Sequence, residues 1–263
     1  MGERVNAIFD AAAVRRHRAR AALRLAPIAG VLEDLAARLL DRLDDTKTRF
    51  VSALEIGGRG FVAAALAERG MQVVSADFSA RMAAMAGGLP VAIDGEALPF
   101  GAQKFDLVVA HLSLHWVNDL PGALLQLRQA MKPDGLFLAS MPVLGTLAEL
   151  HTALLEAEAM LTSGVSPRVS PFPELRDCAG LLQRAGFALP VADVEEIEFL
   201  YADPLALLHE LRAAGESNAV AARSRKIPPR ELFALALSQL AQRDGRVVAT
   251  LRMAIMTGWN ERG

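Results

Sequence analysis

A glycine-rich segment between an apolar run and a helical pattern limits the fold of this chain more than any other feature of its sequence. Residues 50–56 are mostly apolar, Gly57-Gly58-Arg59-Gly60 follows directly, and residues 61–69 have the spacing of a helix that ends at Gly70. Glycine permits the tight turn by which a strand passes into a helix that packs back on it. The segment therefore predicts a strand–turn–helix unit of a parallel sheet.

Short apolar runs recur along the chain and alternate with helical patterns. With residues 50–56 they predict seven strands, the others at residues 73–78, 90–93, 105–114, 136–141, 191–201 and 247–259. Helices are predicted at residues 61–69, 80–86, 120–131, 146–161, 175–185, 205–213 and 230–242, and a turn at Lys132-Pro133-Asp134-Gly135. The predicted fold is α/β, a doubly wound, seven-stranded Rossmann-like sheet with helices inserted after the fifth strand.

The N-terminal part of the chain is predicted to be helical. Residues 5–43 have the apolar spacing of two helices, broken near residues 27–30. We therefore divide the chain into an N-terminal helical flap, residues 1–49, and an α/β domain, residues 50–263. The flap is basic because of Arg15, Arg16, Arg18, Arg20 and Arg24. These arginines fit an interaction arm, a transit peptide or a solvated helix face, and the net charge of -2 favours the solvated face.

Charge balance and cysteine content narrow the surroundings in which the protein is expected to work. The 28 lysines and arginines are matched by 30 aspartates and glutamates, so no overall positive field would attract nucleic acid. Cys178 is the only cysteine, which excludes an internal disulfide and favours a reducing, cytoplasmic location. The uncharged run 135–148 is shorter than the about 20 residues of a spanning helix and contains Pro142, so no membrane span is predicted.

Acidic residues lie at the ends of three neighbouring strands of the predicted sheet. Glu55 belongs to the first strand, and Asp77, at the end of the second, follows Gly57 by 20 residues. A carboxylate at the tip of the second strand can accept both hydroxyls of a ribose. Asp94 ends the third strand, where it can accept a hydrogen bond from an adenine amino group. The pattern predicts a site for a cofactor that contains adenosine.

The glycine turn favours S-adenosylmethionine over a dinucleotide. Pyrophosphate recognition requires the spacing G-x-G-x-x-G beside a helix N-terminus, and this turn lacks the third spacing. Glu55 would repel a phosphate but can accept hydrogen bonds, directly or through water, near a methionine-type ammonium group. The predicted cofactor-binding residues are Glu55, Gly57, Gly58, Gly60, Asp77, Phe78, Asp94, Gly95, Glu96 and His111.

Several of these residues also have a structural interpretation. The glycines serve tight packing even without a ligand, and Glu96 can be an ordinary solvated loop acid. His111 and His115 follow the fourth strand and suit either general base catalysis or packing; packing is favoured because His115-Trp116 has the character of an amphipathic anchor. No catalytic residue is assigned. The five histidines include no close His-x-Asp or His-x-Glu pair, so no metal site is predicted.

The segments 55–60, 94–100 and 105–114, together with Asp77, resemble class I S-adenosylmethionine-dependent methyltransferases. More narrowly, the chain is similar to the mitochondrial complex I assembly factor 5 family and, more distantly, to the malonyl-acyl-carrier-protein methyltransferases of biotin synthesis. The narrower likeness rests on residues 112–121, 132–135, 166–172, 215–218 and 257–259.

This resemblance implies a methyltransferase fold with an antiparallel last strand and S-adenosylmethionine as cofactor. The implied activity is methylation of a protein or a small organic acceptor. The assembly-factor likeness implies an alternative, hydroxylation of an arginine on an iron–sulfur subunit of respiratory complex I, which would then be a partner.

One departure from the resembled class concerns the glycine turn. Related methyltransferases have Asp-Leu-Gly-Cys-Gly-Arg-Gly where this chain has Glu55-Ile56-Gly57-Gly58-Arg59-Gly60, one residue fewer. The lost residue shortens the path by up to about 3.8 Å, more than the ~0.5 Å spread of hydrogen-bond lengths at a ligand. A third interpretation therefore stays open, a non-catalytic assembly chaperone with a degenerate cofactor loop.

Overall fold

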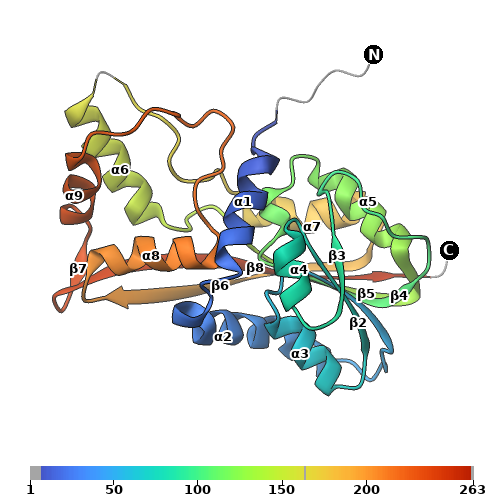
Figure 1. The fold of residues 1–263 in the computed structure, drawn as a ribbon. Coiled ribbons are helices and arrows are strands. Elements are labelled where there is room, and N and C mark those ends of the chain that lie inside the picture. Colours follow the sequence, from blue (N-terminus) through green and yellow to red (C-terminus); the bar gives the residue numbers. More distant parts are fainter. Residues whose placement is uncertain (1–6, 163, 262–263) are drawn as a thin grey trace, which may run out of the picture.

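The computed structural model describes residues 7–162 and 164–261, and a mixed sheet forms its centre (Figure 1). The strands are β1 (Ser52–Ile56), β2 (Gln72–Asp77), β3 (Leu89–Ala92), β4 (Phe105–His111), β5 (Met131–Pro142), β6 (Ala188–Tyr201), β7 (Gln242–Arg243) and β8 (Arg246–Asn260). They lie in the order β3-β2-β1-β4-β5-β8-β6, and β7 pairs with β8. The first five strands pair in parallel and β8 is antiparallel to β5, which confirms the predicted α/β fold and its antiparallel last strand.

Helices cover both faces of the sheet because alternate side chains of the central strands point to opposite sides. Ala53 belongs to the core on one face, with α2 (Ala29–Leu40) and α3 (Phe61–Glu68). Leu54 belongs to the core on the other face, with α5 (Leu120–Ala130) and α7 (Leu175–Arg184). Between β2 and β3 the chain forms the short helix α4 (Ala80–Met85).

The strands β6 and β8 run past the other strands and carry a second group of helices (Figure 1). These helices are α6 (Ala148–Leu161), α8 (Pro204–Ala214) and α9 (Glu231–Ser238). Their buried residues, among them Leu154, Leu207 and Leu232, form a separate apolar cluster with Ala249 of β8. Of the four helices predicted after the fifth strand, this extension contains three, and the fourth, α7, packs on the sheet beside α5.

The N-terminal helices belong to the packed structure. The first of them, α1 (Ala11–Ala21), begins after Asp10, whose carboxylate accepts a hydrogen bond from the Ala13 amide. The prediction of a helix from residue 5 lies partly outside the described residues, and residues 7–10 are not helical. The 3₁₀ turns η1 (Ala26–Ile28) and η2 (Asp41–Leu43) flank α2, whose Leu32 and Leu39 enter the same core as Ala53. The domain division at residue 49 stays a prediction.

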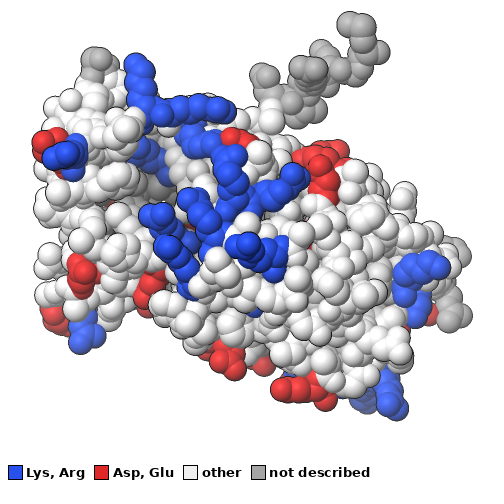
Figure 2. All heavy atoms as spheres, viewed as in Figure 1, with Lys and Arg blue, Asp and Glu red and all other residues white. Residues whose placement is uncertain are grey.

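Helix α1 crosses the front of the molecule, in contact with α4 and α8 (Figure 1). Lysine and arginine side chains gather on this face (Figure 2). Arg15, Arg16, Arg20 and Arg24 are exposed, as the predicted solvated helix face requires.

Several local predictions are wrong: the strand predicted over 105–114 ends at His111, and the two-residue β7 is an eighth strand beyond the seven predicted. Residues 132–135 are not a free turn but part of β5, where the pairing shifts from Phe105–Met131 to Leu107–Leu136 and Asp134 has a φ of 61°. The Pro-Asp-Gly chemistry produces a bulge there, because hydrogen bonding to β4 resumes after it. The helix predicted to reach residue 242 ends at Ser238. The strands β7 and β8 form a hairpin around Asp244-Gly245, and both of these turn residues have a left-handed backbone conformation.

None of the helices in the described ranges has an apolar stretch that would reach across a membrane. The predicted cytoplasmic location stays a prediction.

Candidate cofactor site

The candidate site lies at the carboxyl ends of β1, β2 and β4. The order of strands reverses between β1 and β4, and sheets of this kind bind ligands beyond the strand ends at that point. In the turn after β1, Gly57 has a φ of 76° and Gly60 a φ of 99°, a left-handed conformation that glycine adopts without steric cost. The Gly57 amide donates to the Ala76 carbonyl at 3.0 Å, which brings the turn beside Asp77.

Gly57→Ala is expected to destabilise the protein because the turn has no room for a methyl group. An added Cβ would lie 2.5 Å from Ser113 Cβ and 2.9 Å from the His111 carbonyl oxygen. Gly70 is the matched control, since its φ is 82° but no atom lies within 4 Å of its added Cβ. Urea unfolding should show Gly57→Ala losing about 1–3 kcal/mol more than Gly70→Ala, a typical cost of overpacking. Equal losses would contradict the close packing at Gly57.

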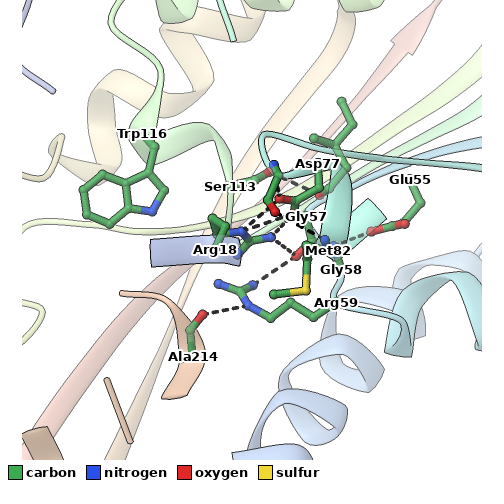
Figure 3. Close-up of polar contacts among 12 residues, drawn as sticks. Arg18, Glu55, Gly57, Gly58, Arg59, Asp77, Met82, Ser113, Trp116 and Ala214 are labelled. Atoms are coloured by element: carbon green, nitrogen blue, oxygen red, sulfur yellow. Dashed lines mark hydrogen bonds and ion pairs between the residues drawn. The ribbon is translucent and has the colours of Figure 1, made fainter. Parts of the chain in front are cut away.

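A buried arginine from α1 occupies the Asp77 carboxylate (Figure 3). Arg18 is 0% exposed, its Nε lies 3.2 Å from Asp77 Oδ2, and its Nη2 forms an ion pair with the same oxygen. The same Nη2 donates to the Gly57 carbonyl oxygen at 3.0 Å. The Ser79 amide donates to Asp77 Oδ1 at 2.8 Å. The carboxylate predicted to bind a ribose therefore pairs with a guanidinium of its own chain.

The prediction of a solvated helix face is wrong for Arg18. The buried residues of α1 are Ala13, Val14, Arg18 and Ala21, which share one side of the helix. Arg18 lies on that side, and Asp77 neutralises its charge there. The helical spacing from Val14 to Arg18 and Ala21 is the signal in the sequence that could have revealed its burial.

A second buried arginine, Arg59, belongs to the glycine turn itself, and its side chain extends below the turn in the view of Figure 3. Arg59 donates from Nη1 to the Gly57 carbonyl oxygen at 3.0 Å and from Nε to the Ala214 carbonyl oxygen at 3.1 Å. It also forms an ion pair with Glu216. Burial and the nearby Arg18 lower the pKa of Arg59 to about 10. In the sequence, Arg59 stands out only as part of the glycine turn.

Glu216 links three side chains at the rim of this site. Its Oε2 accepts hydrogen bonds from His115 Nε2 at 2.9 Å and Trp116 Nε1 at 3.1 Å, while Oε1 pairs with Arg59. Burial alone would raise the pKa of Glu216, but His115, Arg59 and Arg18 lower it to about 2. The glutamate is therefore a carboxylate that anchors His115 and Trp116. Glu216 lies about a hundred positions along the chain from His115 and Trp116, so local sequence patterns could not reveal this contact.

Glu55 turns back into the glycine turn. Its buried carboxylate accepts a hydrogen bond from the Gly58 amide (Figure 3). A Cβ on residue 58 would lie 2.5 Å from the Glu55 Oε1. Burial raises the pKa of Glu55 to about 7. Gly58 is thus required by the Glu55 side chain, which closes the turn from within.

The residues predicted near adenine form the loop after β3. Asp94 is exposed and accepts a hydrogen bond from the Glu96 amide at 3.0 Å. The Glu96 carboxylate accepts from the amides of residues 118 and 119 at 2.9 and 3.0 Å, which fastens this loop to the start of α5. An added Cβ on Gly95 would lie 3.0 Å from Phe78 Cε1. This loop and Phe78 therefore lie in contact.

Phe78 and the side chains of α1 meet at the same place. Phe9, Ala13, Val14 and Trp116 form a small apolar cluster against which Phe78 packs. Helix α1 and the loop predicted to bind adenine therefore both lie against Phe78.

His111 ends β4 but faces the interior. Its Nδ1 lies 2.8 Å from Ser140 Oγ on β5, and the ring is 0% exposed. Burial and the nearby Arg59 lower the pKa of His111 to about 3, so the ring is neutral at pH 7. The contact with Ser140 agrees with the packing interpretation.

The acceptor groups at this site suit the ribose of S-adenosylmethionine. The Asp77 carboxylate and the Gly57 carbonyl oxygen converge on one guanidinium, and neighbouring ribose hydroxyls would present donors to the same groups. Both groups pair with Arg18, so this fit requires the guanidinium to move away. Within residues 7–162 and 164–261, no group of three or more His, Cys, Asp or Glu side chains is placed to hold a metal ion.

A sheet of this order, with a glycine turn after β1 and an acid at the end of β2, defines a class I S-adenosylmethionine-dependent methyltransferase. Residues 54–139 match the family described as methyltransferase domain. The human arginine-hydroxylase NDUFAF5, mitochondrial, is 37% identical over 240 residues, which cover 86% of this chain and 69% of the relative. The malonyl-[acyl-carrier protein] O-methyltransferase of Gallionella capsiferriformans is 31% identical over 96% of this chain and 91% of its own length. The chain belongs to the methyltransferase family that includes both relatives.

A solved structure supports the same fold. Phosphoethanolamine N-methyltransferase 2 of Haemonchus contortus, in complex with S-adenosyl-L-methionine, superposes with a TM-score of 0.52 at 17% identity, over 87% of this chain and 53% of that one. Family membership supports S-adenosylmethionine as the cofactor of this chain.

Proposed function

We propose that this protein transfers a methyl group from S-adenosylmethionine to a protein or a small organic acceptor. The convergence of the Asp77 carboxylate and the Gly57 carbonyl oxygen at the ends of β2 and β1 is the observation that carries this proposal. In it, Asp77 accepts the ribose hydroxyls, and the loop from Asp94 to Glu96 lies beside the adenine. Bound S-adenosylmethionine supplies a methyl group already activated by the sulfonium.

The protein's own residues then have a limited task, which is to hold and align the reactants. Gly57, Gly58 and Gly60 let the backbone approach the ligand closely. Glu55 braces this turn through the Gly58 amide, and its contact with the amino-acid moiety of the cofactor stays a prediction. Arg18 must release Asp77 before the ribose can bind.

Arginine hydroxylation is a second candidate, supported by the 37% identity with the relative named as an arginine hydroxylase. In this case a respiratory complex I subunit would be the partner, as the assembly-factor resemblance implies. Mass spectrometry of candidate acceptors after reaction distinguishes the two activities, because a transferred methyl group and an inserted oxygen atom change the mass differently. Methyl groups labelled in the cofactor would reach the product in the first case alone.

The proposal predicts that S-adenosylmethionine stabilises the folded chain. Ligand at 100 times its dissociation constant should add about 2.7 kcal/mol to the free energy of unfolding. Isothermal titration calorimetry with S-adenosylmethionine and S-adenosylhomocysteine measures the binding directly. No heat at millimolar ligand would overturn the proposal and favour a non-catalytic assembly chaperone with a degenerate turn.

A further inference from the structure

A large cavity begins beside the glycine turn and extends under the second group of helices. Its volume is about 570 Å³, within the range of ~300–1,000 Å³ typical of small-molecule sites. Arg59, Trp116 and Glu216 line it on the side of the cofactor site. Leucines of α2, α6 and α8 and the inner face of β6 and β8 form most of the remaining wall. One end of the cavity thus lies where a methyl group would be delivered, and the rest leads away from it.

The wall is apolar over most of its area and is not fully covered by protein. Leu205 and Phe233 both line the cavity, yet they are 48% and 38% exposed. Exposed apolar groups gathered around a hollow indicate a binding surface, because their contact with water is unfavourable. An apolar ligand inside the cavity would remove them from water.

Strained backbone also marks the wall near the glycine turn. Leu112 follows β4 directly, lines the cavity and has a φ of 44°. A bulky residue in the left-handed region is sterically strained, and such conformations cluster at ligand sites. Its amide donates to the Ser140 carbonyl at 2.9 Å, which holds Leu112 in place.

The charged groups in the wall disfavour a cationic ligand. Two glutamates line the cavity: Glu216, at the end beside the cofactor site, forms an ion pair with Arg59, whereas Glu210 accepts a hydrogen bond from the neutral Tyr201 hydroxyl at 2.7 Å. Three arginines line it as well: Arg59 pairs with Glu216, Arg168 pairs with Glu158, and the third is Arg212. At the Trp116 and Glu216 end, a guanidinium or an ammonium group would lose its hydration and meet only a carboxylate that is already paired with Arg59. A neutral or anionic polar group would avoid this cost.

We propose that this cavity holds the methyl acceptor, and that the acceptor is an elongated apolar molecule with one small neutral or anionic polar head. The head lies at the Trp116 and Glu216 end, beside the cofactor turn, and the apolar chain lies among the leucines of α6 and α8. This inference rests on the proposed methyl transfer and names the chemical class of its acceptor. The proposed acceptor differs from an arginine side chain, whose cationic end the Trp116 and Glu216 end of the cavity does not accommodate.

Tryptophan quenching by brominated fatty acids tests both the site and the orientation. The chain has two tryptophans, and Trp116 lines the cavity whereas Trp259 pairs with Leu136 in the sheet. We expect saturable quenching by 2-bromododecanoate, whose bromine lies beside the head, and at least about threefold weaker quenching by 12-bromododecanoate. Trp116→Phe should remove the difference between the two acids. Absent quenching, or equal quenching by both acids, would overturn the inference.

Competition against 2-bromododecanoate tests the head group. Dodecanoate and dodecanol should displace it, and dodecylammonium should need at least about a tenfold higher concentration. Equal displacement by dodecylammonium would contradict the argument from the wall charges.

Two neighbouring residues of β6 provide matched variants. Phe199 lines the cavity, and Leu200 points to the opposite face of the sheet, where it is 45% exposed. Phe199→Glu should weaken dodecanoate binding at least about tenfold, and Leu200→Glu should leave it unchanged. Leu205→Glu, at a half-exposed position of the wall, should weaken binding as well and avoids a charge deep in the fold. Unchanged binding in both wall variants, with normal thermal melting, would overturn the inference.

Calorimetry with S-adenosylmethionine separates this inference from the proposed function. Cofactor binding without quenching would overturn the apolar acceptor and leave methyl transfer standing. Quenching without cofactor binding would overturn methyl transfer and, with it, the role of the apolar ligand as acceptor.

Discussion

Arg18→Met should lower the free energy of unfolding by about 3–5 kcal/mol, the usual cost of removing one partner of a buried ion pair. Methionine retains much of the length of arginine but leaves the Asp77 carboxylate buried without its guanidinium. Urea unfolding at pH 7 measures the loss. Arg20→Met is the matched control, because Arg20 is on the same helix and exposed, and it should change the stability by less than about 0.5 kcal/mol.

The same substitution should strengthen the binding of S-adenosylmethionine. In the unsubstituted chain the ribose competes with Arg18 for Asp77, so only the fraction of molecules with a released guanidinium can bind. Removing the competing guanidinium should lower the dissociation constant of S-adenosylmethionine at least about tenfold. The variant would therefore bind the cofactor more tightly although it is less stable. Calorimetry below the melting temperature of the variant measures this. Weaker binding in Arg18→Met would show that Arg18 stays in the complex as a ligand of the cofactor.

The outcomes for Asp77 and Arg18 show what sequence patterns reveal and what they miss. Asp77 and the glycine turn belong to one strand–turn–helix unit and the next strand, so their spacing along the chain determines that they meet. Arg18 reaches the same place from a helix that precedes the sheet. Asp77 lies 59 positions further along the chain, and the helical spacing around Arg18 does not identify Asp77 as its partner.

Side-chain direction set a further limit on prediction. The position of Glu55 in β1 was predictable, but its rotation toward the Gly58 amide depends on the packing inside the turn. Similarly, the sequence of residues 215–218 supports only a resemblance to a family and no role for Glu216, although Glu216 joins His115, Trp116 and Arg59. The cavity could not be predicted either, because its wall combines several helices with the strand extension.

Asp77→Asn should weaken the binding of S-adenosylmethionine by roughly tenfold to a hundredfold, because a hydrogen bond to a charged group contributes about 1.5–3 kcal/mol. In the otherwise unsubstituted chain this effect is mixed with the loss of the Arg18 pair. The clean comparison is therefore made in the Arg18→Met background, where calorimetry should still show the loss of affinity.

The losses of stability should not be additive in the double-mutant cycle of Arg18→Met and Asp77→Asn. Asp77→Asn alone leaves Arg18 charged and buried, at a cost of about 3–5 kcal/mol. In the Arg18→Met background the same change removes an unpaired buried carboxylate, so the combined loss should be well below the sum of the two single losses. Additive losses in stability would show that the two side chains do not pair in solution. Unchanged affinity on Asp77→Asn in the Arg18→Met background would place the ribose elsewhere.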